Sequence, residues 1–523
     1  MYSSKILAEE PSSLTNSQKF IRREDLCPLT RLKIALIGQF FKRHGTITRL
    51  AKRHDISRVF VYVLINQLSE YAEDLFGEIV ALRQKEQLQA REEDNLHRLL
   101  RYRLIGTCSL GKCSELLRQD QALNTSVGWC SETLEKMGSL LDNTVDWQGQ
   151  AVFASDEIYY IEHRPILVTV EPISGAILRI DLEPNLTKQG WERHWEGLRQ
   201  QGITPLLLVR DEGHILKAAQ ESLLTDVAYQ PDTFHAITHR LCRIEQQLEK
   251  QACHAIGHEY EREKIAQQAV SKKVISKKKK AYQESQDQAA QALDTLASFS
   301  WLYHYSRHQL RIIRSDGSLR ARSHAEAEVQ AALDLMRTLP VKGIKEVITQ
   351  IEKVLPDLFG FLDRAIDVVK HLHQQLPPEI VPFYLLYWQQ CRAYANVKSS
   401  QHRQRIRPQI QWLEEFLQQE SSHSQRDFLI DRALVFAHMD GVIQSSAMVE
   451  CANSRLRPFI REMRGQLSHA TLNLIMFYHN HCPFKRGKRK GKAPIELLSG
   501  QPLEKDWLTL LLDKVRPQLR TAA

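Results

Sequence analysis

The amino-acid sequence predicts an α+β protein in which a mixed β-sheet is interrupted by a large, wholly helical region. Short runs rich in Val, Ile and Tyr alternate with helix patterns over residues 148–240, whereas residues 241–440 are helix-forming and contain four glycines. A basic region with the spacing of a helix-turn-helix precedes both. The composition is that of a globular chain, since 43% of the 523 residues are hydrophobic and 25% are charged.

Residues 1–74 are predicted to form a helix-turn-helix DNA-binding region. Apolar spacing over Leu29–Phe40 suits one buried helix face, Gly45 ends that helix, and Thr46 and Ser57 can cap two more. In this motif the last helix enters the major groove. An ordinary three-helix cluster is the alternative. The residues expected to contact DNA here are Arg49, Lys52, Arg53 and Arg58.

Residues 75–147 are predicted to be a helical linker that contains a second candidate helix-turn-helix. Leu75–Arg103 has the composition of one charged helix. A short helix at Leu110–Arg118, a polar turn and a helix around Val127–Met137 then repeat the earlier order of elements. Together the two motifs would give a bipartite DNA-reading module.

Residues 148–240 are predicted to form the first part of a mixed-sheet core. The fourth expected strand is almost wholly apolar, as strands buried on both faces are. Helices fit the segments before and after it, so the order is β-β-β-α-β-α-β-α. The expected strands are Gln150–Tyr160, Pro165–Pro172, Ala176–Leu182, Ile203–Arg210 and Val227–Gln230.

The rest of the chain is predicted to be helical. Residues 241–440 form an inserted helical domain, because Ala, Gln, Glu, Lys and Leu dominate their composition. Residues 441–482 complete the core with a helix that carries Glu450. Residues 483–523 are expected to be a basic loop, Lys485–Lys492, followed by an amphipathic helix.

Positive charge is concentrated at two places in the sequence. Lys19–Arg58 contains eleven basic residues against three acids, and Asn453–Lys492 contains ten against the single acid Glu462. The whole chain carries only +9, so the middle is close to neutral. Neutralising phosphates releases counterions, so this pattern favours a nucleic-acid partner over an anionic membrane.

Three acidic residues stand where a metal site could form. Asp156 ends the apolar part of the first strand, Asp211 directly follows the buried fourth strand, and Glu450 lies near the start of a later helix. An acid at a buried strand end is costly unless it is solvated, paired or bound to a cation. Carboxylates suit Mg²⁺, and paired ions can clamp both oxygens of a phosphodiester displacement. Three surface turn residues are the alternative.

This arrangement resembles the ribonuclease H-like core of DDE transposases and integrases. The resemblance covers about Gln148–Arg240 and Gly441–Asn480, with a helix-turn-helix ahead. The stretch Met448–Phe459, followed by Tyr478-His479-Asn480 and by Lys492–Leu498, is similar to the end of a bacterial insertion-sequence transposase.

The resemblance implies a transposase that cleaves DNA and transfers strands at transposon ends. Asp156, Asp211 and Glu450 would be the catalytic ligands of two Mg²⁺ ions, for which Mn²⁺ can substitute. Its partners would be double-stranded DNA, both terminal repeats and target, and a second copy of the chain once assembled on DNA. Helical spacing places Asn453 and Arg457 on the face of Glu450, near the scissile phosphate. Further DNA contacts are expected from Lys485, Arg486, Lys488, Arg489 and Lys490.

Several alternatives stay open. The 239-residue separation of Asp211 and Glu450 requires the helical insertion, and Glu414, Glu415 or Glu420 could replace Glu450. Glu157 and Glu212 could replace their neighbouring aspartates, although strand alternation lets one residue of each pair face the metals. The function could also be that of a ribonuclease H-like DNA nuclease without strand transfer, or of a non-catalytic DNA-binding regulator.

Other reaction classes lack their motifs. His235 and His239 are four residues apart, but the Glu that follows the first His of zinc proteases is missing, so we expect a packed or phosphate-facing pair. The sequence contains neither a P-loop nor a G-x-S-x-G elbow.

The sequence is expected to be that of a cytoplasmic, nucleoid-associated protein without a membrane partner. Nine scattered cysteines suggest free thiols, and the spacing of Cys108, Cys113 and Cys130 fits packed thiols better than a zinc site. Met1–Asn16 lacks the apolar stretch of a secretory signal, and no apolar run approaches the length of a membrane span.

Overall fold

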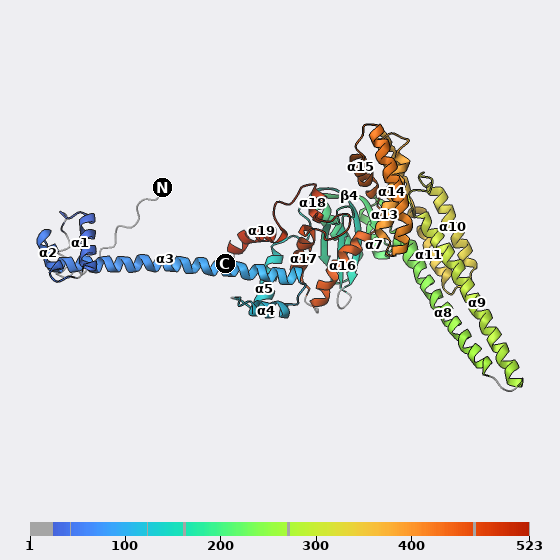
Figure 1. The fold of residues 1–523 in the computed structure, drawn as a ribbon, viewed down its shortest axis with the longest axis horizontal. Coiled ribbons are helices and arrows are strands. Elements are labelled where there is room, and N and C mark those ends of the chain that lie inside the picture. The colour runs from blue at the N-terminus through green and yellow to red at the C-terminus, as the bar shows by residue number, and fades with distance from the viewer. Residues whose placement is uncertain are drawn as a thin grey trace. The chain divides into compact units, whose positions relative to one another are not determined.

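The structure is a computed structural model that describes residues 23, 25–41, 43–122, 124–159, 164–268, 272–463 and 467–521 (Figure 1). Met1–Asn16 and Tyr160 lie outside these residues. The chain divides into two compact units, one formed by the described part of Met1–Leu99 with Leu116–Thr125, the other by Leu100–Glu115 and Ser126–Ala523. The predicted α+β class with a helical insertion is confirmed.

The first unit is built on three helices: α1 (Pro28–Phe40), α2 (Thr46–Arg53) and α3 (Arg58–Leu100). Gly45 takes the left-handed backbone conformation between α1 and α2, with φ +81°. The Ser57 hydroxyl caps α3 by accepting the backbone N–H of Phe60 at 3.0 Å. The three helices share a small apolar core of Leu26, Ile34, Ala35, Leu50, Ala51, Phe60, Val61, Leu64 and Ile65. The predicted three-helix order is therefore confirmed.

The third helix is longer than predicted. The sequence suggested a third helix that begins near Ser57 and ends before residue 75, and a separate helix from Leu75, but α3 runs through both without a break. No Gly or Pro lies between Leu68 and Leu75, so nothing in this segment interrupts the backbone hydrogen bonds. The expected boundary after residue 74 therefore falls inside one helix.

The second unit contains a five-stranded mixed sheet with the order β3-β2-β1-β4-β5. The β1–β2 and β2–β3 pairs are antiparallel, whereas β4 is parallel to both β1 and β5. Every predicted strand is present, with its ends shifted by at most two residues. The strands are β1 (Gly149–Tyr159), β2 (Pro165–Val170), β3 (Ile177–Leu182), β4 (Ile203–Arg210) and β5 (Ala228–Pro231).

Helices cover both faces of this sheet. Ser155 of β1 bonds to α6 (Lys188–Gln200), while the next residue, Asp156, bonds to α16 (Ala447–Glu462). Because neighbouring strand residues point to opposite faces, α6 and α16 lie on opposite sides of β1. The remaining helices of this part are η2 (Arg101–Ile105), α4 (Leu110–Gln119), α5 (Val127–Ser139), α7 (His214–Leu223), α17 (His469–His481), α18 (Pro494–Ser499) and α19 (Trp507–Thr521).

The second candidate helix-turn-helix contributes to the core. Both of its helices, α4 and α5, are present where the sequence predicted them. However, α5 packs on α17, and a Cβ at Gly138 would collide with the Ala470 backbone. The buried face of α5 is therefore occupied within this unit.

The helical insertion follows β5 and has its own apolar core, which extends from Ala236 to Val442. The long helices α8 and α9 run side by side (Figure 1). Its elements are the π-helix η4 (Phe234–His239), α8 (Arg240–Gln267), α9 (Lys272–Gln309), α10 (Arg322–Thr338), α11 (Ile344–Leu358), α12 (Gly360–Gln375), α13 (Val381–Asn396), α14 (Ser400–His423) and α15 (Phe428–Asp440). Among the described residues, no helix combines the length and apolarity needed to cross a bilayer.

Candidate active site

The fold brings the three predicted acids to one edge of the sheet. Parallel β1 and β4 are adjacent, and Ala154 pairs with Val209. Asp156 and Asp211 each follow that pair by two residues, so both stand at the same end of neighbouring strands. Glu450 lies in the first turn of α16, which packs across β1 and β2. The helical insertion thus separates the acids in sequence but not in space.

The acids interact electrostatically. Burial raises the pKa of Asp156 from its ordinary value of 3.8 to about 7, and the negative charges of Asp211 and Glu450 contribute to the rise. Burial and nearby like charges both disfavour an ionised carboxylate. Ionisation of Asp156 is therefore disfavoured in this cluster, a condition that a bound cation would relieve.

Two side chains of α16 hold the acids. Asn453 is completely buried, and its Nδ2 donates to Asp156 at 2.9 Å, while its Oδ1 has no hydrogen-bond partner among the described residues. Arg457 pairs with Glu450 at 3.3 Å. Helical spacing correctly predicted that these residues share a face with Glu450. Contact of either residue with DNA stays a prediction.

The rival acids have other surroundings. Glu212 accepts a hydrogen bond from the hydroxyl of Tyr229, whose ring stacks under Arg210. Glu157 lies on the opposite face of β1 from Asp156 by strand alternation, although burial and the neighbouring acids raise its pKa to about 7. The three other candidates lie on α14, which packs against α13 and α15: Glu414, Glu415 and Glu420.

The donor chemistry of the cluster fits Mg²⁺. Three carboxylates and the unpartnered Oδ1 of Asn453 are hard oxygen donors of the kind that this ion takes. Within the described part of the chain, no group of three or more His, Cys, Asp or Glu already stands in a metal-binding arrangement.

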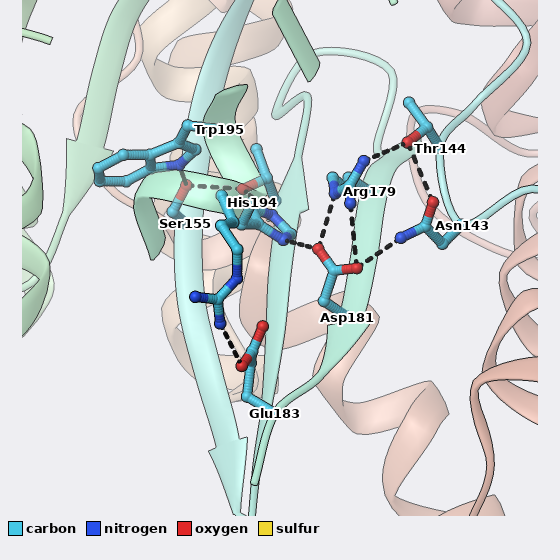
Figure 2. A network of polar contacts seen from close by, with 10 residues as sticks. Asn143, Thr144, Ser155, Arg179, Asp181, Glu183, His194 and Trp195 are labelled. Carbon is cyan, nitrogen blue, oxygen red and sulfur yellow. Dashed lines mark hydrogen bonds and ion pairs between the residues drawn. The ribbon is translucent and has the colours of Figure 1, made fainter. Parts of the chain in front are cut away.

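A buried polar network supports β1 from the other face (Figure 2). Trp195 donates to Ser155 at 3.2 Å, Ser155 to Thr169 at 2.8 Å, and Thr169 to Nε2 of His194 at 2.9 Å. His194 Nδ1 donates to Asp181 at 2.6 Å. The indole of Trp195 can only donate and the carboxylate of Asp181 can only accept, so with a neutral His194 ring each hydrogen bond of this network is donated in the direction from Trp195 to Asp181.

The charges of this network fit that direction. Burial lowers the pKa of His194, so its ring is neutral and Nε2 can accept from Thr169. Although burial alone would raise the pKa of Asp181, donation by His194 and by Arg179 holds it well below its ordinary range. The network fixes Ser155, the residue next to Asp156. The sequence analysis missed it, although polar residues at buried positions of three consecutive strands are a usable signal.

The predicted basic loop has two kinds of side chain. Arg489 donates to the carbonyls of Pro172 and Ile173, in the turn between β2 and β3, at 2.6 and 2.7 Å. Lys488 pairs with Asp440 at 3.1 Å. Both therefore have partners within the protein. The remaining predicted DNA contacts of the loop are exposed: Lys485, Arg486 and Lys490.

The four basic residues of the first unit that are expected to contact DNA are exposed to solvent. Three lie on α2 and one at the start of α3, and none of the four has an acidic partner among the described residues. This is the arrangement that a DNA-contacting face needs, although the contacts themselves stay a prediction. The residues are Arg49, Lys52, Arg53 and Arg58.

Comparison with models of known protein families finds no match, and comparison with curated proteins finds no significant relative. The case for a function therefore depends on the geometry described above.

Proposed function

We propose that this protein is a metal-dependent transposase, which cleaves DNA at transposon ends and joins the freed strand to target DNA. The observation that carries the proposal is the convergence of Asp156, Asp211 and Glu450: burial, together with the negative charges of Asp211 and Glu450, raises the pKa of Asp156 to about 7. The order of strands and the helical insertion are those that the resemblance to DDE transposases implies. The cofactors of this reaction would be Mg²⁺ ions, for which Mn²⁺ can substitute.

The side chains around the three acids would have different roles in this reaction. Divalent ions, when bound, activate the attacking oxygen and offset charge on the phosphate. Asn453 holds one oxygen of Asp156 and so fixes the direction of that carboxylate. Arg457 balances the charge of Glu450, and its guanidinium would offer donors to the oxygens of a phosphate held beside the acids.

DNA would be held at separate places. The exposed cations of α2 and α3 suit reading of the terminal repeats, since base edges near a recognition helix specify sequence. Exposed cations of the loop Lys485–Lys492 suit phosphates, which position the duplex without specifying it. Joining two ends requires at least two copies on DNA.

The test starts from a duplex selected from a random pool for binding to the full chain. Wild type should cut this duplex with Mg²⁺ or Mn²⁺, and D156N and E450Q should bind it but cut at least about 100-fold more slowly, because metal-assisted charge stabilisation is worth several kcal/mol. The matched control is E415Q, which makes the same change at an exposed rival position on α14.

Three results would count against the proposal. Equal cutting by wild type and D156N would exclude the site, and loss of cutting in E415Q would move the third ligand to the helical insertion. Supplying pre-cleaved ends with plasmid tests the joining step. Cutting without insertion of these ends would leave a nuclease in place of a transposase.

A further inference from the structure

A cavity of about 390 Å³ lies beside Asp211, where the chain leaves the sheet and enters the helical insertion. The loop after β4 forms one wall, and side chains from η4 and the start of α8 form the other. Its volume lies within the roughly 300–1,000 Å³ of ordinary ligand pockets. Four basic side chains line it: His235, His239, Arg240 and Arg243.

The backbone that presents these side chains is fixed. Oδ1 of Asp232 accepts the backbone N–H groups of Phe234 and His235 at 2.7 and 3.1 Å, which anchors the first turn of η4. Its Oδ2 accepts the backbone N–H of Ser446, directly before α16, at 2.8 Å. The π-helical turn is a form that occurs often at functional sites. Asp232 thus ties the cavity wall to the helix that carries Glu450.

The basic side chains of the cavity lack acidic partners among the described residues, whereas its acids are engaged. Arg240 donates to an amide oxygen, that of Gln350, and Arg243 is exposed. The rings of His235 and His239 contact each other, with centroids 5.4 Å apart. The three acids that line the cavity already accept hydrogen bonds: Asp211 from the backbone N–H of Gly213, Glu212 from Tyr229, and Asp232 from the start of η4. The cavity therefore presents free cationic donors.

The cavity adjoins the acid cluster. Burial lowers the pKa of His239, the neighbouring basic side chains lower it further, and Glu450 acts in the opposite direction. His239 therefore feels both the cations of the cavity and an acid of the site, while Asp211 lines the cavity itself. A group bound here would lie next to the reacting atoms.

We infer that this cavity is a phosphate subsite, which holds a backbone phosphate of the DNA strand adjacent to the phosphate being cut. Arg243 offers a planar fork of donors to the phosphate oxygens, and His239 offers a ring N–H. The anion relieves the repulsion among the basic side chains. The inference rests on the proposed function, because it names the part of the substrate that this site takes.

The first test measures binding alone, in the absence of divalent ions. A labelled pentathymidylate is titrated against the full chain at several salt concentrations. R243Q should weaken binding at least about tenfold, which corresponds to about 1.4 kcal/mol, because a charged hydrogen bond is lost, and should reduce the salt slope by about 0.7. The control K250Q removes an exposed charge from the same helix and should change neither value.

The second test uses the selected duplex with single methylphosphonates, which remove the charge of one phosphate at a time. One substitution beside the cleaved bond should slow cutting by wild type, and the same substitution should have no further effect on R243Q. If R243Q and H239Q bind and cut like K250Q, the subsite is wrong while the proposed function stands. If R243Q weakens oligonucleotide binding but wild type never cuts DNA, the cavity binds a backbone phosphate, but the proposed function is wrong and the cavity is no part of a cleavage site.

Discussion

Asp156 couples the acid cluster to the stability of the whole fold. Its pKa is about 7 in the folded protein against an ordinary 3.8, so the folded chain holds this proton more tightly than the unfolded chain does. The free energy of unfolding should therefore fall as pH rises from about 4 to about 7 and level off above that range. Glu157, whose pKa burial also raises to about 7, should add to this dependence over the same pH range.

D156N should remove the part of this dependence that comes from Asp156 and leave the part that comes from Glu157. At pH 8 we expect the free energy of unfolding of the variant to exceed that of wild type by on the order of a few kcal/mol, so the variant should melt at a higher temperature. Near pH 4 the two proteins should differ little. Scanning calorimetry across this range measures the effect. Mg²⁺ at pH 8 should stabilise wild type but much less so D156N. Parallel stability curves for the two proteins would contradict this account.

Asn453 and Arg489 were predicted as DNA contacts, and both have hydrogen-bond partners inside the protein that the sequence could not reveal. Asn453 was expected to face DNA, yet it is buried and bonded to Asp156. Arg489 was expected to contact phosphates, yet its guanidinium holds the turn between β2 and β3. Helical spacing and charge identified both positions as important. They could not identify the partners, because those lie hundreds of residues away in the chain.

At the scale of the elements, the two faces of the sheet contact different helices. One side of β1 presents Asp156 to α16, and the other binds α6 through the network of Ser155, Thr169 and His194. Each polar group of that chain has one partner on either side. Breaking it at its middle should therefore leave two buried groups unsatisfied.

T169V tests this network with a side chain of the same shape. Ser155 and His194 would each lose a partner, at roughly 1–3 kcal/mol for each buried group, so urea unfolding should show a loss of about 2–5 kcal/mol. The matched control is T204V, at an exposed position of β4, which should stay within about 0.5 kcal/mol of wild type. A loss in T169V no larger than in T204V would show that the network does not stabilise the sheet.

Local sequence signals predicted most elements correctly, for physical reasons that also explain the failures. Segments rich in Val, Ile and Tyr with turn residues between them predicted all five strands. The expected burial of Ile203–Arg210 on both faces holds for its second half only, because Thr204 and Leu206 are exposed. The continuity of α3 and the π-helical turn η4 were missed, since a missing breaker and one extra residue per turn leave little trace in composition. The acids were paired because parallel strands end at one edge.

At the scale of the whole second unit, the helical insertion leaves and re-enters the core at adjacent points. The backbone N–H of Thr233 donates to the carbonyl of Gln444 at 3.1 Å. Arg364 on α12 donates to the side chain of Gln230 on β5 and to the carbonyl of Ile443, at 2.6 and 3.1 Å. These contacts lock the start of α16, and so Glu450, to the sheet.

R364Q should loosen that lock. Burial already lowers the pKa of Arg364 to about 10, and a shorter amide would not reach both oxygens. We expect cutting of the selected duplex to fall about 10- to 100-fold, as for residues that orient metal ligands, with helix content by circular dichroism unchanged. K370Q, an exposed change on the same helix, is the control. Equal activity of R364Q and K370Q would show that the insertion does not position the acids.

The contact between Thr233 and Gln444 also sets an order of events during synthesis on the ribosome. Asp156 and Asp211 emerge early, but Glu450 emerges only after the entire inserted domain, and it reaches them only once the two ends of that domain have met. Under the proposed function, a nascent chain would thus have the helices proposed to read terminal repeats long before it could cut DNA. Translation that stops inside the insertion would release a product that occupies DNA without breaking it.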